Sequence, residues 1–432
     1  MFKGDGDMKK LLILVLLILA LIMGFAYTFP DYLEIPFVDE KEIYNQEDEV
    51  EEDETEEDEK EKIEEATILA AGDVMVHSPQ VDVARRLARE QAREYNFLPS
   101  FEYISPYLNK ADISVANLET TLGPGAPSGY PYFNSPDELA VDLKKAGFDL
   151  LCTANNHSLD TGEEGLYRTL DVVEEEGLKP FGTARSQEER DTPLIVDVNN
   201  IEVAFLAYTD STNAIPIPEG REYMVNYIDV NSEEGLSRGK EMISSDIEAA
   251  REEGAEIVAV YMHWGDEYQI PGPNNLQERL AKKVAHSGGD IIFGSHPHVI
   301  QPMEFLEVEK EDGSTHETLV VYSMGNFISN QHKIPGAVPA EEVKYGLSVK
   351  VHLKKEGKES PAEVDEVDYL ITWVNRDYKY QVIPVHYLLD GSPEEFNIPE
   401  EKFQRIEPVT GETTRRLGDF QPVSALEEVL SN

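Results

Sequence analysis

The residues of this sequence that could do chemistry gather in five short blocks. Each block places one or two metal-ligand residue types beside small or turn-forming residues: Gly72–His77, Asn117–Glu119, Asn155–His157, His263–Gly265 and Gly294–His298. At least four of the five directly follow an apolar run that is typical of a buried β-strand. Open α/β sheets build their sites at the carboxyl ends of strands. We therefore expect one metal centre assembled from distant segments.

Two carboxylates are the first candidates for metal ligands. Asp73 follows an apolar strand and a glycine, where an unpaired buried charge would be costly, although aspartate is also common as a helix N-cap. Glu119 ends the next predicted strand, and its two oxygens could bind separate cations; a salt-bridged strand end is the alternative. His77 could reach the same centre as Asp73, or lie at the surface or cap a helix.

The third block offers a ligand and a general acid side by side. Asn156 supplies a neutral oxygen ligand, and His157 is a natural general acid because its pKa lies near working pH. Asp160, three residues on, could orient the imidazole of His157. The alternative is a polar turn that begins the helix predicted at Gly165.

Three later histidines complete the candidate ligands. His263 follows the apolar run Ile257–Met262, where a histidine is often a core residue, but this strand breaks directly after it. His296 and His298 flank Pro297, and alternate residues of an extended chain point to opposite sides. Either Pro297 bends the chain so that both imidazoles face one site, or the two histidines serve the two metals of a pair.

Alternating strand and helix patterns predict the elements that position these blocks. Such alternation indicates βαβ units. Strands are expected at 67–71, 113–116, 148–153, 201–208, 257–262, 290–293 and 319–323, and helices at 81–93, 136–146, 165–176, 232–253 and 276–286. A later all-β region is expected to hold strands at 347–353, 364–374 and 380–385. Beyond about residue 390 the only periodic segment is a short amphipathic end, 423–430.

The N-terminal segment predicts a membrane anchor. Residues 11–29 are apolar almost throughout, which is long enough for a helix to span the hydrocarbon core. Lys9 and Lys10 place residues 1–10 in the cytoplasm and the rest of the chain outside. A cleaved signal peptide is the alternative, but its apolar region would usually be shorter and followed by a small-residue site. We expect a single-pass cell-membrane protein with an extracellular domain.

The charge of the chain restricts its partners. Among 432 residues, 85 are Asp or Glu and 37 are Lys or Arg, for a net charge of −48. Nucleic acids and anionic membranes require a basic footprint, so we expect neither as a direct ligand. Residues 30–65 carry much of the charge and should form an extended, disordered linker that holds the domain off the membrane. A cation-collecting tail is the alternative.

Taken in order, the blocks resemble the metallophosphoesterase (calcineurin-like) superfamily, and within it the CapA family tied to poly-γ-glutamate capsule synthesis. The matching segments are Gly72–Met75, Asn117–Glu119, Ala154–His157, His263–Glu267, Gly294–His298 and Ser323–Phe327, with Thr372–Val374 similar to the family's C-terminal strand. The likeness covers roughly residues 67 to 385. It implies a four-layer α/β/β/α sandwich over residues 66–390, followed by a C-terminal extension, 391–432.

The resemblance also implies a site for two divalent metal ions bridged by Glu119. By similarity, the ligands would be Asp73, Glu119, His298 and additionally His77 for one metal, and Glu119, Asn156, His263 and His296 for the other. His157, oriented by Asp160, would protonate the leaving group while an activated water attacks phosphorus. Mixed nitrogen and oxygen ligands fit Mn, Fe or Zn better than Ca or Mg.

Two positions depart from the superfamily's pattern. Its first block normally reads Asp-x-His, but Met75 occupies the histidine position here, and methionine is a poor ligand for hard cations. One metal would therefore be held weakly unless His77 compensates. The usual bridging aspartate is here Glu119, which is one carbon longer. Both features resemble CapA proteins.

The function implied by the resemblance is hydrolysis of a phosphoester in poly-γ-glutamate or capsule synthesis or export. Partners would be membrane subunits of a polyglutamate synthase or export complex, and the substrate a phosphoester or an anionic polymer. One alternative is a non-catalytic assembly or export factor that keeps the fold. Another is a metal-dependent hydrolase of polyglutamate amide bonds, since an activated water can also attack a carbonyl.

Overall fold

A computed structural model describes residues 63–89, 92–310, 313–332, 341–357 and 360–423. The predicted cytoplasmic segment (1–10), the predicted anchor (11–29) and the predicted linker up to residue 62 lie outside these residues, as does nearly all of the predicted amphipathic end. Among the helices that the structure describes, none combines the length and the apolarity needed to cross a membrane.

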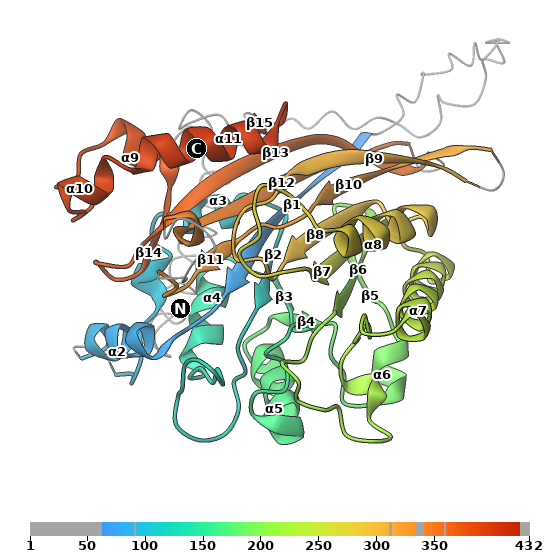
Figure 1. The fold of residues 1–432 in the computed structure, drawn as a ribbon, viewed down its shortest axis with the longest axis horizontal. Helices are drawn as coiled ribbons and strands as arrows, with labels where there is room; N and C mark the ends of the chain where they lie inside the picture. Colours follow the sequence, from blue (N-terminus) through green and yellow to red (C-terminus); the bar gives the residue numbers. More distant parts are fainter. Residues whose placement is uncertain (1–62, 90–91, 311–312, 333–340, 358–359, 424–432) are drawn as a thin grey trace, which may run out of the picture. The chain divides into compact units, whose positions relative to one another are not determined.

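The first of two β-sheets mixes parallel and antiparallel strands (Figure 1). In order across the sheet, its strands are β14 (Gln381–Pro384), β13 (Ala362–Asn375), β12 (Tyr345–Glu356), β1 (Ile63–Val74), β2 (Ile113–Leu118), β3 (Leu150–Cys152) and β4 (Lys179–Phe181), with β11 (Asn326–Ile328) pairing with β1 and β15 (Gln421–Pro422) with β13. Strands β1 to β4 run parallel, whereas β12 to β14 form an antiparallel set beside β1. The carboxyl ends of β1, β2 and β3 therefore meet at one edge.

The second sheet has a parallel centre and antiparallel edges. Its order is β5 (Leu194–Val198), β6 (Ile201–Thr209), β7 (Ile257–His263), β8 (Ile291–Ser295), β10 (Thr315–Val321) and β9 (Met303–Glu309). Strands β6, β7, β8 and β10 are parallel, while β5 and β9 run against their neighbours. Strands β7 and β8, which carry the fourth and fifth blocks of candidate ligands at their ends, are thus centrally placed.

The two sheets pack face to face, and helices cover their outer faces. One buried cluster joins Ile68 and Val115 of the first sheet to Phe205 and Tyr261 of the second. Helices α2 (Ser78–Leu87), α4 (Glu138–Ala146) and α5 (Gly162–Glu175) pack on the first sheet, and α7 (Glu233–Glu252) and α8 (Asn275–His286) on the second (Figure 1). The expected mixed α/β fold is confirmed as two sheets with helices outside them.

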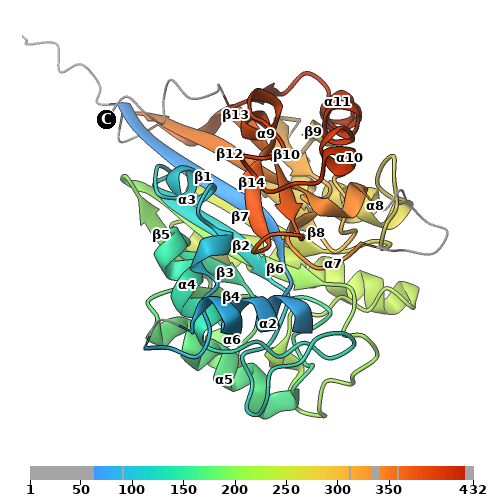
Figure 2. The same ribbon diagram turned by 90° about the vertical axis from the view of Figure 1, so that its left-hand side faces the viewer.

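Shorter helices complete the described part of the chain. These are η2 (Leu98–Ser100), α3 (Ser105–Leu108), α6 (Gln187–Asp191), η3 (Glu222–Met224), η4 (Glu342–Lys344), α9 (Val385–Asp390), α10 (Glu400–Phe403) and α11 (Ile406–Leu417). Figure 2 shows α9, α10 and α11 together beside β13 and β14. Residues 391–423, predicted as an extension, contribute Ile406 and Leu417 to the cluster between the sheets.

Several predicted boundaries differ from the structure, among them the start of the domain and the end of its first helix. Strand β1 begins at Ile63, three residues before the predicted domain start at Ala66, because Ile63 to Glu65 pair with the end of β12. Helix α2 ends at Leu87 rather than at Arg93. Arg93 instead forms an ion pair, 2.7 Å long, with the fully buried carboxylate of Asp142 on α4. That pairing takes Arg93 away from the helix axis.

Candidate metal centre

The candidate ligands converge because the strands that precede them end at the same place. Asp73 lies near the end of β1, Glu119 directly follows β2, and His263 is the last residue of β7. Gly72 allows another segment to approach the end of β1 closely. A Cβ atom on Gly72 would lie 2.0 Å from the Gly325 oxygen, so any side chain at residue 72 would displace the turn before β11.

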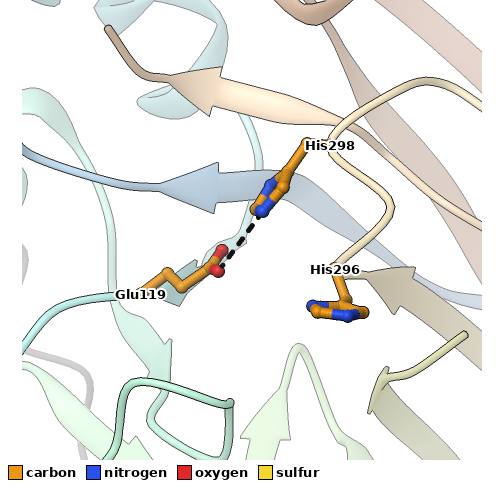
Figure 3. Close-up of side chains that lie close together, drawn as sticks. All are labelled: Glu119, His296 and His298. Atoms are coloured by element: carbon orange, nitrogen blue, oxygen red, sulfur yellow. Dashed lines mark ion pairs between the residues drawn. The ribbon is translucent and has the colours of Figure 1, made fainter. Parts of the chain in front are cut away.

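A carboxylate with one oxygen that lacks a hydrogen-bond partner lies at the middle of the cluster. Glu119 is fully buried, and its Oε1 atom lies 3.7 Å from Nε2 of His263 and 3.7 Å from Nε2 of His298. Figure 3 shows the Glu119 and His298 side chains pointing toward each other, with His296 beside them. The structure gives this oxygen no hydrogen bond. A buried, unsatisfied carboxylate oxygen is costly, and a cation between these side chains would satisfy it.

Asp73 and His296 extend the cluster on either side. Asp73 Oδ2 lies 3.0 Å from His298 Nδ1. His296 Nδ1 lies 3.0 Å from His263 Nε2, and the Asn156 Oδ1 atom is also 3.0 Å from that nitrogen. The structure thus brings six of the seven sequence-predicted ligands into one buried group of nitrogen and oxygen atoms.

Two overlapping sets of side chains have the spacing of metal ligands. One set is Glu119, His296 and His298, and the other is Asp73, Glu119 and His263; within each, the ligand atoms lie within 4.8 Å of one another. Glu119 belongs to both sets, as expected for a bridging carboxylate. The sequence-based grouping placed Asp73 with His298 and His263 with His296, and the atoms of each of these pairs also lie 3.0 Å apart. The buried mixture of imidazole and carboxylate donors fits divalent transition metals.

The protonation of the buried groups follows from their burial. Burial, and next the charge of Asp73, raise the pKa of the Glu119 carboxyl well above its ordinary value. Burial lowers the pKa of His263 well below the usual range and that of His296 to about 3. Neutral imidazole is the form that binds a metal, and a bound cation would reverse the preference at Glu119.

The two histidines themselves, and not Pro297 alone, bend the loop after β8. His296 and His298 both have positive φ angles, 92° and 56°. Residues other than glycine rarely adopt this backbone conformation, which costs about 1–3 kcal/mol per residue and is concentrated at functional sites. As a result the two imidazoles lie with ring centroids 5.9 Å apart. Both therefore reach the same buried centre.

His157 and Asp160 form a hydrogen-bonded pair next to the cluster. Asp160 Oδ2 lies 2.6 Å from His157 Nδ1, and the Asp160 side chain is fully buried. This contact favours a proton on Nδ1, and Asn213 Nδ2 lies 3.3 Å from Nδ1 and 3.4 Å from Nε2. Asp160 thus contacts the imidazole that the sequence suggested it could orient. His157 lines a cavity of about 610 Å³ that His298 also lines.

His77 lies in the wall of this cavity but outside both ligand sets. Its backbone N–H donates to Gln80 Oε1 over 2.8 Å at the start of α2, and its Nδ1 atom accepts a hydrogen bond from the backbone of Asn330. Burial lowers the pKa of His77 to about 4. The helix-capping alternative is therefore the one that the contacts of His77 match. Met75 is buried nearby, with its sulfur 3.9 Å from Gln331 Nε2.

Three polar residues hold the ligands in place, and the sequence did not predict their roles. Asn117 Nδ2 donates to Asp73 Oδ1 over 2.8 Å, and Asn155 Nδ2 donates to Asn117 Oδ1 over 3.1 Å. Ser295 Oγ lies 3.0 Å from His263 Nδ1. Such contacts orient ligands and tune the metal. In the sequence only their position could have indicated these roles, since each lies within two residues of a predicted ligand.

Comparison with protein families gives one match. A family described as bacterial capsule synthesis protein, PGA_cap, matches residues 67–331. This range contains every candidate ligand as well as His157 and Asp160.

Two curated relatives come from Bacillus. The chain is 27% identical over 278 residues to the capsule biosynthesis protein CapA of Bacillus anthracis, a match that covers 62% of this chain and 61% of the relative. It is 28% identical over 264 residues to the PGA biosynthesis protein CapA of Bacillus subtilis (strain 168), covering 60% and 62%. The chain therefore matches less than two thirds of the length of either relative.

Solved structures give weaker similarities. The calcineurin-like phosphoesterase YfkN from Bacillus subtilis aligns with a TM-score of 0.40 at 14% identity, over 80% of this chain and 100% of the other. A phosphatase from Mycoplasma pneumoniae aligns with a TM-score of 0.37 at 12% identity, over 77% and 99%.

Proposed function

The chain belongs to the bacterial capsule synthesis protein family PGA_cap, and from this membership we propose that it hydrolyses a phosphoester at a two-metal centre in capsule or poly-γ-glutamate synthesis or export. The observation that supports the chemistry most directly is Glu119 Oε1. This buried oxygen lacks a hydrogen-bond partner and lies 3.7 Å from an imidazole nitrogen of each of two histidines. A carboxylate in that position is suited to bridging two cations.

Five buried side chains would hold the metals: Asp73, Glu119, His263, His296 and His298. When bound, two such ions would lower the pKa of a water and stabilise the charge that develops on the phosphoryl oxygens. Asn117 and Ser295 keep Asp73 and His263 in place through their hydrogen bonds. The chain itself therefore supplies a rigid and dry set of ligands.

His157 supplies the proton of the reaction. In hydrolysis, a water oxygen forms a new bond to phosphorus, the bond from phosphorus to the ester oxygen breaks, and that oxygen needs a proton. With Nδ1 held by Asp160, His157 donates from Nε2, which faces the cavity beside His298. General acids of this kind contribute about 10²–10⁴-fold to rate.

We also propose that residues 11–29 anchor the protein in the cell membrane with the catalytic domain outside. Membrane subunits of a polyglutamate synthase or export complex would then be its partners. The apolar run after Lys9 and Lys10 supports this topology. Protease treatment of intact cells should remove the domain, and a domain that is protected until the cells are lysed would contradict the proposal.

The test of the chemistry uses the purified full-length protein loaded with Mn, Fe or Zn. We expect about two bound metals per chain and turnover of phenyl phosphate. His296→Ala should lower kcat/KM by about 100-fold or more, whereas His286→Ala, which changes an exposed histidine on α8, should leave it unchanged. Failure to retain metal, or undiminished hydrolysis by His296→Ala, would refute the proposed phosphoesterase activity. Capsule formation that persists with His296→Ala would favour an assembly factor.

A further inference from the structure

The cavity beside the metal centre has a wall rich in aromatic side chains. His157 and His298 line its inner end, and Tyr130, Tyr132 and Tyr268 contribute to its wall. Its volume, about 610 Å³, is enough for a small organic group next to the reacting phosphoryl group. The residues around it therefore bear on which substrate reaches the metals.

Residues 128–134, here called the tyrosine loop, are fixed against the general acid. Ser128 and Asn134 exchange two backbone hydrogen bonds, 2.9 and 3.1 Å long, which close the loop. The Phe133 backbone N–H donates to Asp160 Oδ2, the same oxygen that holds His157. The Phe133 ring meets the His157 ring edge-on, with centroids 4.6 Å apart. The loop is thus part of the same hydrogen-bonded unit as His157.

The loop also packs tightly against the start of α2. A Cβ atom on Gly129 would lie 2.7 Å from the backbone nitrogen of Ser78, so only glycine permits this approach. The Phe133 ring also lies edge-on to His77, the residue before Ser78, with centroids 4.8 Å apart. Two contacts with the start of α2 therefore set the position of the loop's tip.

At that tip, two tyrosines are left open to solvent. Tyr130 is 81% exposed and Tyr132 is 56% exposed, the largest values for big hydrophobic side chains in the described residues. Both line the cavity. Aromatic rings held in water on an anchored loop, next to a candidate active site, are typical of a surface that contacts a ligand.

A third tyrosine is fixed near the ligand His298. Tyr268 has a positive φ of 64°, and its backbone N–H donates to the Pro297 oxygen over 2.8 Å. Its hydroxyl accepts a hydrogen bond from Gln331 Nε2 over 3.1 Å. Its ring lies 5.8 Å from that of His298. Tyr268 therefore occupies a strained but well-bonded position directly beside the metal ligand.

The described residues of the cavity wall include no lysine or arginine that could pair with additional negative charge. The one carboxylate among these residues is Glu267. Bound metals would balance the charge of the phosphoryl group. A carboxylate or second phosphate elsewhere on the substrate would meet no lysine or arginine among the described lining residues. Aromatic faces instead attract planar rings.

From these observations we propose that the cavity is a binding subsite for the leaving group, and that the substrate is a phosphoester whose alcohol part carries a ring and no negative charge, stacked on Tyr130 and Tyr132. This inference rests on the proposed function. The reaction is the hydrolysis described above, in which water is consumed and His157 protonates the departing ring-bearing alcohol.

The first test measures kcat/KM for three esters with the metal-loaded full-length protein: phenyl phosphate, glycerol phosphate and 4-carboxyphenyl phosphate. The double variant Tyr130→Ala/Tyr132→Ala should lose about 10-fold on phenyl phosphate and stay within twofold on glycerol phosphate. Comparing variants on one ester removes differences in intrinsic reactivity. Tyr130→Phe/Tyr132→Phe should restore the activity, and Phe305→Ala, an exposed aromatic outside the cavity, should have no effect. Glu267→Gln should raise kcat/KM most for 4-carboxyphenyl phosphate.

The second test measures binding without turnover, so that the two proposals can fail separately. Calorimetry should show phenylphosphonate binding to the metal-loaded protein about 10-fold more tightly than methylphosphonate, and the double alanine variant should lose this preference. If the preference is present but no ester is hydrolysed, the subsite stands and the hydrolase fails. If esters are hydrolysed but the double variant has the same kcat/KM as the original protein for all of them, the subsite is refuted. Absence of both activity and preference overturns both.

Discussion

At the scale of single residues, Glu119 is the side chain that a metal changes most. It is buried, burial raises its pKa well above the ordinary value, and one of its oxygens lacks a partner. A cation would turn this unfavourable group into a ligand shared by two sets of side chains. The free energy of metal binding should therefore appear as stability of the folded chain.

Removing the metals is predicted to lower the melting temperature of the original protein more than that of Glu119→Gln. At a free metal concentration of about 100 times Kd, binding stabilises the fold by about 2.7 kcal/mol. Glutamine cannot bridge two cations, so its variant should gain less from metal and lose less to a chelator. Scanning calorimetry with and without chelator measures both changes. Equal losses in the two proteins would show that Glu119 is not a ligand.

His157→Gln is predicted to slow the hydrolysis of esters to an extent that depends on their leaving groups. A poor leaving group such as phenol needs the proton from His157, so kcat for phenyl phosphate should fall about 100-fold. The more acidic 4-nitrophenol leaves without that proton, and kcat for its ester should fall far less. Steady-state rates on both esters, with metal content measured in parallel, test this. A uniform loss on both esters would contradict a role as general acid.

At the scale of elements, the C-terminal helix α11 reaches the loop that carries two ligands. Arg416 on α11 donates to the Ile300 oxygen over 2.7 Å, two residues after His298. It also pairs with Glu342 at 3.3 Å, and the two side chains are only 10% and 3% exposed. Residues beyond 390 are thus coupled to the metal centre as well as to the core.

Arg416→Met is predicted to destabilise the fold by about 3–5 kcal/mol, because Glu342 would remain buried without its partner. Arg416→Met/Glu342→Gln should recover much of that loss, since the stranded charge is gone. Denaturant unfolding of Arg416→Met, Glu342→Gln and the double variant completes the double-mutant cycle. Additive losses would mean that the pair is not coupled. Both Arg416 variants should also bind metal more weakly, because they lack the bond to Ile300.

The sequence predicted the central elements well and the peripheral ones poorly. Parallel strands buried on both faces appear as continuous apolar runs, which is why β1, β2, β7 and β8 were predicted together with the ligands that follow them. Helix α11 contains Pro408 and Gly411 and is ordered by tertiary contacts of Ile406 and Leu417, so it has little local signal. Edge strand β9 alternates only weakly between buried and exposed residues.

The candidate site was predictable as a set of residues but not as a geometry. The strand ends brought Asp73, Glu119 and His263 together as expected. The left-handed backbone of His296 and His298, with which both imidazoles reach the same centre, is not encoded in the sequence spacing. The tyrosine loop was missed for a related reason. It lies in no block, and it reaches His157 through long-range contacts of Phe133, the bond to Asp160 among them.

At the scale of the whole molecule, charge sets which polymer the protein can approach. The chain carries a net charge of −48, and the cavity wall offers no lysine or arginine among its described residues. Poly-γ-glutamate is itself a dense polyanion. Two like-charged macromolecules repel each other over roughly 10 Å at 0.1 M salt, less at higher salt. The proposed part in polymer synthesis therefore fits a small phosphoester better than direct docking of the polymer in the cavity.

Poly-γ-glutamate is accordingly predicted to be a weak inhibitor of phenyl phosphate hydrolysis at low salt and to inhibit more as calcium or sodium chloride is added. Added cations screen the repulsion, so the dependence on salt is opposite to that of an oppositely charged ligand. Inhibition curves at several salt concentrations, with the catalytic metal held at a buffered level, measure this trend. Free glutamate at the same carboxylate concentration controls for removal of metal from Glu119 and its neighbours. Strong competition at low salt, relieved as salt rises, would contradict the charge-based expectation. Release of shortened polymer in the same mixtures would show that the protein also hydrolyses the amide bonds of the polymer.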